Sequence, residues 1–148
     1  MDDMQETLVA LFTEIAILEQ LVRVREERHA LHNLSMGEFG LLNYFMLNNP
    51  RPESIAGMAF VFQEEEDHTR AKVDSLAARG LVSVTPATDP RNAMVMITDK
   101  GRDARNEVID KMAPVIKMAV SEIPPQEIVA TLKTLREIRL TLDNLPDR

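Results

Sequence analysis

The pattern of apolar residues changes at Gly80, and this change limits the possible fold more than any other feature of the sequence. Before Gly80, apolar residues recur at steps of three and four, as in amphipathic helices. After it, two short runs that favour strands, 81–85 and 94–97, flank the turn-rich stretch 86–92. Helical spacing resumes after Asp99. The sequence therefore predicts a mainly α-helical fold with one small β-hairpin.

Six helices are expected around this hairpin. Ser35 and Glu38 have the spacing of a capping box, which places a helix start after Ser35. Asn-Asn-Pro at 48–50 ends that helix, because proline cannot continue it. Gly80 is expected to end another helix in a left-handed conformation. The expected helices span residues 4–30, 36–48, 52–62, 65–79, 101–121 and 126–144.

The first and last of these helices carry more apolar surface than one domain can cover. Residues 4–30 show two apolar stripes, so two sides of the helix must be buried. Residues 126–144 show a heptad-like seam. We expect residues 1–34 and 101–148 to form a dimerisation region intertwined with the segment 35–100. Its contacts would include Leu8, Leu11, Ile15, Ile128, Leu135, Ile138 and Leu142.

Composition excludes several classes of function. The sequence has no cysteine, so it forms no disulfide, thiolate nucleophile or cysteine-ligated metal site. No stretch approaches the roughly 20 apolar residues of a membrane span, and the acidic start does not resemble a secretory signal. Neither a glycine-rich phosphate loop nor a catalytic Ser–His–Asp pattern is evident. We expect a cytoplasmic protein with no enzymatic activity, no cofactor and no membrane partner.

The charge distribution argues against a generally basic surface. The net charge is −7, and residues 35–98 carry 5 basic and 8 acidic side chains. A basic domain is the usual electrostatic signature of nucleic-acid binding. Any binding of DNA must therefore depend on a few local cations.

Short helix, turn, second helix and hairpin follow one another as in a winged helix-turn-helix. "SLAARGLV" (75–82) resembles the junction of recognition helix and wing in MarR-family regulators. "DPRNAMVMITDKGR" (89–102) resembles their wing, with its Asp-x-Arg tip. Similar matches are "LSMGEFGLLNYF" (34–45), "PESIAGMA" (52–59) and "IPPQEIVATLKTLREI" (123–138). The resemblance covers nearly the whole chain.

This resemblance implies a function. MarR-family proteins are homodimers whose two winged segments bind pseudo-palindromic double-stranded DNA. The recognition helix enters the major groove, and the wing arginine, here Arg91, reaches the minor groove. Many members are repressors that a small apolar or aromatic ligand releases from DNA. Other members respond to oxidation of a cysteine, a mode of regulation that this sequence excludes because it has no cysteine.

The expected recognition helix has a definite orientation. At 100° per residue, Thr69, Val73, Leu76 and Ala77 point inward. Asp67, His68, Ala71, Asp74 and Ser75 then point outward, with Glu64 near the start if the helix reaches that far, and Arg70 and Lys72 lie on the flanks.

Four consecutive acids, Glu64–Asp67, stand where this helix begins, and they have three possible explanations. The acids can cap the helix and point away from DNA, leaving Arg70, Lys72, Arg51 and Arg91 to bind it. Asp67 or a glutamate can accept a hydrogen bond from a cytosine amino group. Alternatively, the segment has lost general DNA affinity, and the acidic face binds a protein or mimics DNA.

Each candidate DNA contact has a structural alternative. Arg91 can pair within the wing with Asp89, and Arg70 can pair with Asp67 or Asp74 at helical spacing. Ser54 can touch phosphate, but capping the helix that follows is the better explanation. The other candidates are His68, Lys72, Asp67 and Arg51.

A ligand pocket is a further expectation. His29 and His32 have a spacing that a metal could use, but no third ligand is evident, so pocket or surface positions are favoured. Met36, Met46, Met112 and Met118 lie on helices that border the ligand cleft in relatives. Flexible methionines suit an apolar ligand and equally suit plain core packing.

Overall fold

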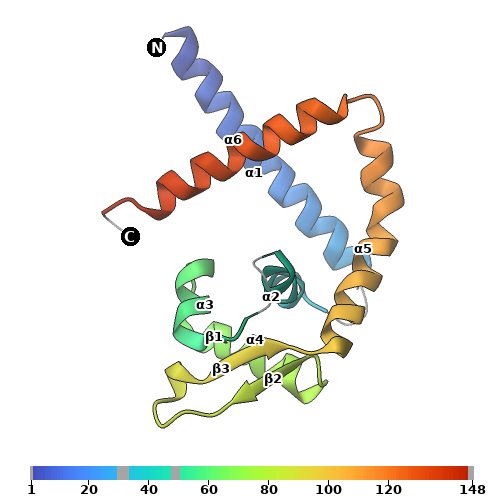
Figure 1. Ribbon diagram of the computed structural model, residues 1–148. Helices are drawn as coiled ribbons and strands as arrows, with labels where there is room; N and C mark the ends of the chain where they lie inside the picture. Colours follow the sequence, from blue (N-terminus) through green and yellow to red (C-terminus); the bar gives the residue numbers. More distant parts are fainter. Residues whose placement is uncertain (1, 30–33, 48–50, 147–148) are drawn as a thin grey trace. The chain divides into compact units, whose positions relative to one another are not determined.

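The computed structural model describes residues 2–29, 34–47 and 51–146, apart from the side chains of residues 26–29. In these ranges the chain is mainly helical with one small sheet (Figure 1). The elements are α1 (Asp3–His29), α2 (Met36–Leu47), β1 (Glu53–Ser54), α3 (Ile55–Phe62), α4 (Glu66–Ala78), β2 (Val82–Thr85), the 3-10 turn η2 (Pro90–Asn92), β3 (Met94–Ile97), α5 (Asp99–Ala119) and α6 (Pro125–Asp143).

The chain divides into two compact units, residues 1–109 and 110–148. Unit 1 holds the elements from α1 to the first half of α5, and unit 2 holds the rest of α5 and α6. In unit 2, Pro125 is the first residue of α6, a position where a proline loses no helical hydrogen bond.

The hydrophobic core lies in unit 1 and combines three helices with the sheet. The helices α2, α3 and α4 contribute residues that are fully or almost fully buried, and so does each strand of the hairpin. The core residues include Leu41, Leu42, Phe45, Ile55, Met58, Val73, Leu76, Leu81, Val82, Val95 and Ile97. The inward face predicted for residues 65–79 is confirmed, because Thr69, Val73 and Leu76 are buried and Ala77 packs against the core.

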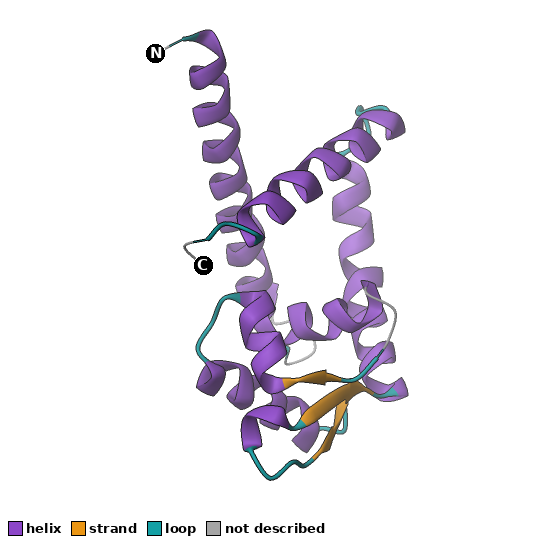
Figure 2. Cartoon of the chain, turned by 60° about the vertical axis from the view of Figure 1, so that its left-hand side comes forward, coloured by secondary structure: helices purple, strands orange, loops and turns teal. Residues whose placement is uncertain are grey.

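The sheet has three strands in the order β1-β3-β2, all antiparallel (Figure 2). The hairpin pairs Val82 with Ile97 and Thr85 with Met94, as the two runs after Gly80 predicted. The third strand was missed: Glu53 pairs with Val95, where the sequence had suggested the start of a helix. A strand of two residues is too short to show alternation of apolar and polar side chains.

The junction between α4 and the sheet depends on two glycines. Gly80 has a φ of 72°, as expected for the residue that ends this helix. Thr98 donates a hydrogen bond to the carbonyl oxygen of Gly80, at 2.7 Å. Gly101 lies so close to Leu81 that a Cβ on it would overlap the Leu81 carbonyl oxygen. A side chain at position 101 would therefore push α5 away from the start of the wing.

No helix within the described ranges is both long and apolar enough to cross a membrane.

Candidate functional site

The turn between α3 and α4 sets the direction of the candidate recognition helix. Ser54 caps α3 by accepting a hydrogen bond from the amide of Gly57, at 2.9 Å. Gln63 ends α3 with a φ of 51°, and the amide of Glu64 donates back to Ala59 at 3.1 Å. The cap confirms the structural role expected for Ser54.

The outward face of α4 carries the residues that its periodicity predicted. All five of them are exposed: Asp67, His68, Ala71, Asp74 and Ser75. The carboxylate of Asp67 forms no ion pair or hydrogen bond with any described residue. This face therefore presents two acids, one histidine and two small side chains to the solvent.

Glu64 does not belong to that face. The helix begins at Glu66, and the side chain of Glu64 folds back against α4. Thr69 Oγ1 donates to it at 2.7 Å, and Lys72 Nζ lies 2.5 Å from it. Burial by itself would raise the pKa of Glu64, but the hydrogen bonds from Lys72 and Thr69 and the lysine charge outweigh it and lower the pKa.

Lys72 is held inside unit 1 by the same contacts. Its ammonium group stands 5.3 Å from the centre of the Phe62 ring, a cation–π distance. Its alkyl chain lies against Gly37 of α2, where a Cβ would be 2.9 Å from Lys72 Cδ. Its side chain is only 19% exposed. Contact with DNA would require Lys72 to leave Glu64 and Phe62.

Arg91, at the tip of the wing, pairs with the first turn of α4. Its guanidinium Nη2 lies 2.8 Å from Glu66 Oε1 in the first turn of α4. Asp89, which the sequence offered as an alternative partner for the Arg91 side chain, instead accepts a hydrogen bond from the backbone amide of Arg91, at 3.1 Å. Asp89 thus shapes the turn η2, while the arginine side chain reaches across to α4.

Two other candidate DNA contacts, Arg51 and Arg70, differ in their exposure to solvent. Arg51 is exposed and precedes β1. Arg70 is half-buried and, with Asp74, lines an open cavity of about 270 Å³ between α4 and the wing. The apolar wall of this cavity includes Ile55, Val73, Val84, Pro86 and Pro90.

One ion pair near the end of α4 was missed by the sequence reasoning. Arg79 pairs with Glu38 of α2 and donates to Ser75 Oγ at 2.9 Å. Glu38 also accepts from Ser75, at 3.3 Å, and caps α2 together with Ser35. Pairs between residues so distant in sequence leave no periodic signal that could reveal them.

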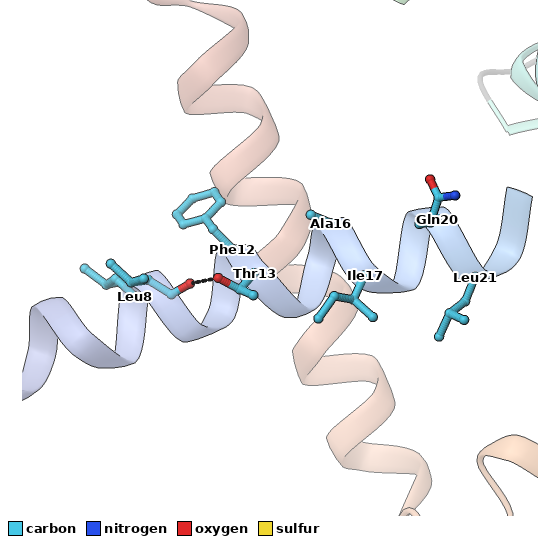
Figure 3. A pocket seen from close by; sticks show the side chains of 8 residues that line it. Leu8, Phe12, Thr13, Ala16, Ile17, Gln20 and Leu21 are labelled. Atoms are coloured by element: carbon cyan, nitrogen blue, oxygen red, sulfur yellow. Dashed lines mark hydrogen bonds between the residues drawn. The ribbon is translucent and has the colours of Figure 1, made fainter.

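Helix α1 carries many exposed apolar side chains, several of which are drawn in Figure 3. An open hollow there is lined by Leu8, Val9, Phe12, Thr13, Ala16, Ile17, Gln20 and Leu21. Thr13 donates to the carbonyl oxygen of Val9 at 2.8 Å, so its polar group is satisfied within the helix. Of the predicted dimer contacts in unit 1, Leu8 and Leu11 are exposed and Ile15 is half-buried.

In unit 2, α6 also carries exposed apolar side chains. Ile128, Leu135 and Leu142 are exposed, and Ile138 is half-buried. No residue of α6 is fully buried in the single chain.

The candidate ligand residues are only partly described. Met36 and Met46 lie in α2 of unit 1, and Met46 packs against the core. Met112 lies in α5 within unit 2. The side chain of His29 and all of His32 fall outside the described part of the chain. In the described part, no group of three or more potential metal ligands occurs.

Comparison with known proteins gives matches among solved structures alone. No protein-family model matches the sequence, and no curated protein matches it. The transcriptional regulator BldR from Sulfolobus solfataricus is 25% identical, with a TM-score of 0.70 over 93% of this chain and 99% of that chain. Staphylococcus aureus MarR, in complex with salicylate and kanamycin, is 18% identical, with a TM-score of 0.73 over 95% and 96%.

A third similar structure is an organohalide-sensing transcriptional regulator in its 2,4-dichlorophenol-bound form. It is 20% identical, with a TM-score of 0.69 over 99% of this chain and 88% of that chain. These likenesses confirm the winged helix-turn-helix fold that the sequence predicted.

Proposed function

We propose that this chain, which has the winged helix-turn-helix fold of MarR-family transcriptional regulators, is a DNA-binding transcriptional regulator. The observation that supports this proposal most is that the wing tip lies beside α4 in unit 1. There, Arg91 Nη2 is 2.8 Å from Glu66 Oε1. A recognition helix reads the major groove, and an arginine beside it can enter the neighbouring minor groove. The exposed face of α4 and the wing tip have this arrangement.

The proposed DNA contacts follow from exposure and charge. Arg91 would enter the minor groove, Arg51 would bind phosphate, and Arg70 would bind a phosphate or base edge. His68 and Asp67, both exposed on α4, would face the major groove, where Asp67 can accept from a cytosine amino group. We assign weaker roles to Lys72 and Ser54, because each already has partners within the protein.

We further propose that the protein acts as a homodimer on a pseudo-palindromic operator. Residues 1–34 and 101–148 would form the dimerisation region, and residues 35–100 would bind DNA. The exposed leucines and isoleucines of α1 and α6 support this, because large apolar patches on soluble proteins commonly mark interaction sites. A dimer would present two recognition helices to successive turns of DNA.

The proposed regulation is steric repression that a small ligand relieves. Two similar structures contain aromatic ligands, salicylate in one and 2,4-dichlorophenol in the other. We propose an apolar or aromatic effector for this chain, with His29, His32, Met36, Met46 and Met112 as candidate contacts. The effector would change the spacing of the two DNA-binding segments.

A fluorescence polarisation titration tests DNA binding directly. The probe is a pool of labelled duplexes of about 30 base pairs, or three helical turns, from which the protein selects its own site. The selected duplex should bind in a sequence-selective and salt-sensitive manner. Arg91→Ala should weaken binding by at least about tenfold and reduce the salt slope by about 1.

Arg136→Ala is the matched control, because it removes the same charge from an exposed position of α6. It should leave DNA affinity nearly unchanged. If Arg91→Ala binds the selected duplex as tightly as the unmutated protein does, the wing does not belong to the proposed DNA interface.

A second function, binding of a partner protein by the acidic face, has one observation in its favour. Lys72, Arg79 and Arg91 are each paired with a glutamate, while Glu65, Asp67 and Asp74 face the solvent. Such a face repels phosphate. If no duplex from the pool binds even at low salt, this second function becomes the better proposal.

A further inference from the structure

We infer that Glu66 competes with DNA for the guanidinium of Arg91, and so acts as a positioning residue that limits DNA affinity. This inference rests on the proposed function and adds a form of regulation to the same site. Glu66 belongs to the acidic run that opens α4, and Arg91 is the cation best placed to enter a minor groove. The two side chains are 25 residues apart and meet at 2.8 Å.

The pair is exposed enough for DNA to displace it. The side chain of Arg91 is 54% exposed and that of Glu66 is 37% exposed. Exposed ion pairs contribute little to stability, because water and salt screen them. The Lys72–Glu64 pair is different, since its side chains are only 19% and 20% exposed. A phosphate can therefore replace Glu66 far more easily than it can replace Glu64.

The backbone of the wing remains fixed when the guanidinium moves. Asp89 Oδ1 accepts from the amide of Arg91 at 3.1 Å and so holds the turn η2. The amide of Ile55 donates to the carbonyl oxygen of Ala93 at 3.2 Å, which ties the turn to the start of α3. Only the arginine side chain must rotate to exchange Glu66 for DNA.

This exchange predicts a particular dependence on salt. A cation that binds phosphate releases about 0.9 counterions from duplex DNA. Salt also screens the exposed Arg91–Glu66 pair, so Glu66 competes with DNA most strongly at low salt. Removing the charge of Glu66 should therefore raise DNA affinity most at low salt, and should steepen the salt slope by much less than the roughly 0.9 of one phosphate contact.

The test compares Glu66→Gln with Glu65→Gln. Glu65 is the adjacent acid; it is exposed and has no side-chain partner in the described part of the chain, so its variant removes an equal charge without breaking a pair. The probe is the duplex that the unmutated protein selects from the pool, or the pool itself if no duplex is selected. Glu66→Gln should bind about three- to tenfold more tightly, and Glu65→Gln less than about twofold. Equal effects of the two variants would overturn the inference, because general repulsion would then explain both.

A double-mutant cycle locates the effect at Arg91. In an Arg91→Ala background, Glu66→Gln should improve binding no more than Glu65→Gln does. An undiminished effect in that background would also overturn the inference.

A measurement without DNA separates this inference from the proposed function. Nitrogen-15 NMR of labelled protein reports whether the Arg91 side chain is restrained, and Glu66→Gln should increase its motion while Glu65→Gln should not. If the unmutated protein binds no DNA but Glu66→Gln does, the inference is supported. If no variant binds any duplex, the proposed function fails and competition with DNA fails with it, while the NMR result still decides whether Glu66 restrains the arginine.

Discussion

The winged segment and the terminal helices of this chain use similar apolar residues in opposite ways. In the winged segment, Leu41, Leu42, Met58, Leu76 and Val95 are completely buried by their own neighbours. In α1 and α6, no described side chain is fully buried, although leucines and isoleucines recur at helical spacing. The winged segment, residues 35–100, forms a hydrophobic core within the single chain, whereas α1 and α6 leave most of their apolar side chains exposed.

This difference indicates what each part needs in order to be stable. Burying a leucine or isoleucine side chain contributes about 1.5–3 kcal/mol, and isolated helices in water are marginal without such burial. The winged segment obtains this stabilisation within one chain. Helices α1 and α6 would obtain it from a second copy, as we propose. The predictions below test this contrast.

The largest effect is expected from Gly101→Ala, which attacks the packing of the winged segment. The new Cβ would overlap the Leu81 carbonyl oxygen, and neither backbone can move without disturbing the sheet. We expect the free energy of unfolding to fall by about 3 kcal/mol or more. Urea denaturation at a fixed protein concentration measures it.

Gly40→Ala is the matched control. Gly40 lies inside α2, and a Cβ there would meet nothing within 4 Å. Alanine favours helix over glycine, so this variant should be more stable by about 0.5–1 kcal/mol. Equal destabilisation by the two substitutions would refute the specific close contact at Gly101.

The next largest effect is expected from Leu135→Glu in α6. A charge in the proposed dimer seam should raise the dissociation constant of the dimer at least about 100-fold, or about 2.7 kcal/mol. Sedimentation equilibrium gives this constant. Thr134→Glu adds the same charge at the preceding exposed residue and should change it far less.

Dimers that tolerate both substitutions would show that α6 does not supply the interface. The proposal that α6 is stabilised by a second copy of the chain would then be wrong.

A moderate effect is expected from Ser54→Ala at the start of α3. This substitution removes the side-chain acceptor for the amide of Gly57 and should lower the free energy of unfolding by about 1 kcal/mol. Ser54→Asp keeps an acceptor and should retain most of the stability. If DNA affinity fell in Ser54→Ala without any loss of stability, phosphate contact would be the better explanation for this residue.

The smallest effect concerns the pH dependence at Glu64. Because its folded pKa is lowered below the ordinary 4.5, the ionised carboxylate stabilises the fold above that value. The contribution disappears as the pH falls through the lowered pKa. Glu64→Gln should therefore be less stable than the unmutated protein at pH 7, by up to about 1 kcal/mol, with the gap closing under acid conditions.

Thermal unfolding followed by circular dichroism across this pH range measures the gap. Glu65→Gln provides the comparison at an exposed acid and should show a much smaller difference at pH 7. A gap for Glu64→Gln that stays constant with pH would contradict the assignment.

The sequence predicted much of the fold because helices and hairpins depend on nearby residues. The capping box at Ser35, the left-handed Gly80 and the inward position of Val73 each follow from spacing along one element. The strand β1 was missed, because it is too short to carry a periodic pattern. Residues 86–92 were predicted as a turn, but its 3-10 helix η2 was not.

The candidate site was less predictable than the fold. Periodicity identified the outward face of α4, and a serine at a helix start indicated the capping role of Ser54; both are local properties. It could not assign partners to Glu64, Glu66 and Arg79, since an ion pair needs only proximity and opposite charge. Three of the cations near α4 thus proved to be engaged within the protein.

The sequence by itself determined that four consecutive acids stand where α4 begins and that the wing carries one arginine, Arg91. The tertiary structure decided what those acids do: Glu64 holds Lys72, Glu66 holds Arg91, and Asp67 faces the solvent. The charge of each side chain follows from its residue type, but the choice of ion-pair partner depends on distances in space. The Arg91–Glu66 distance, for example, exists only after the wing has folded back beside α4.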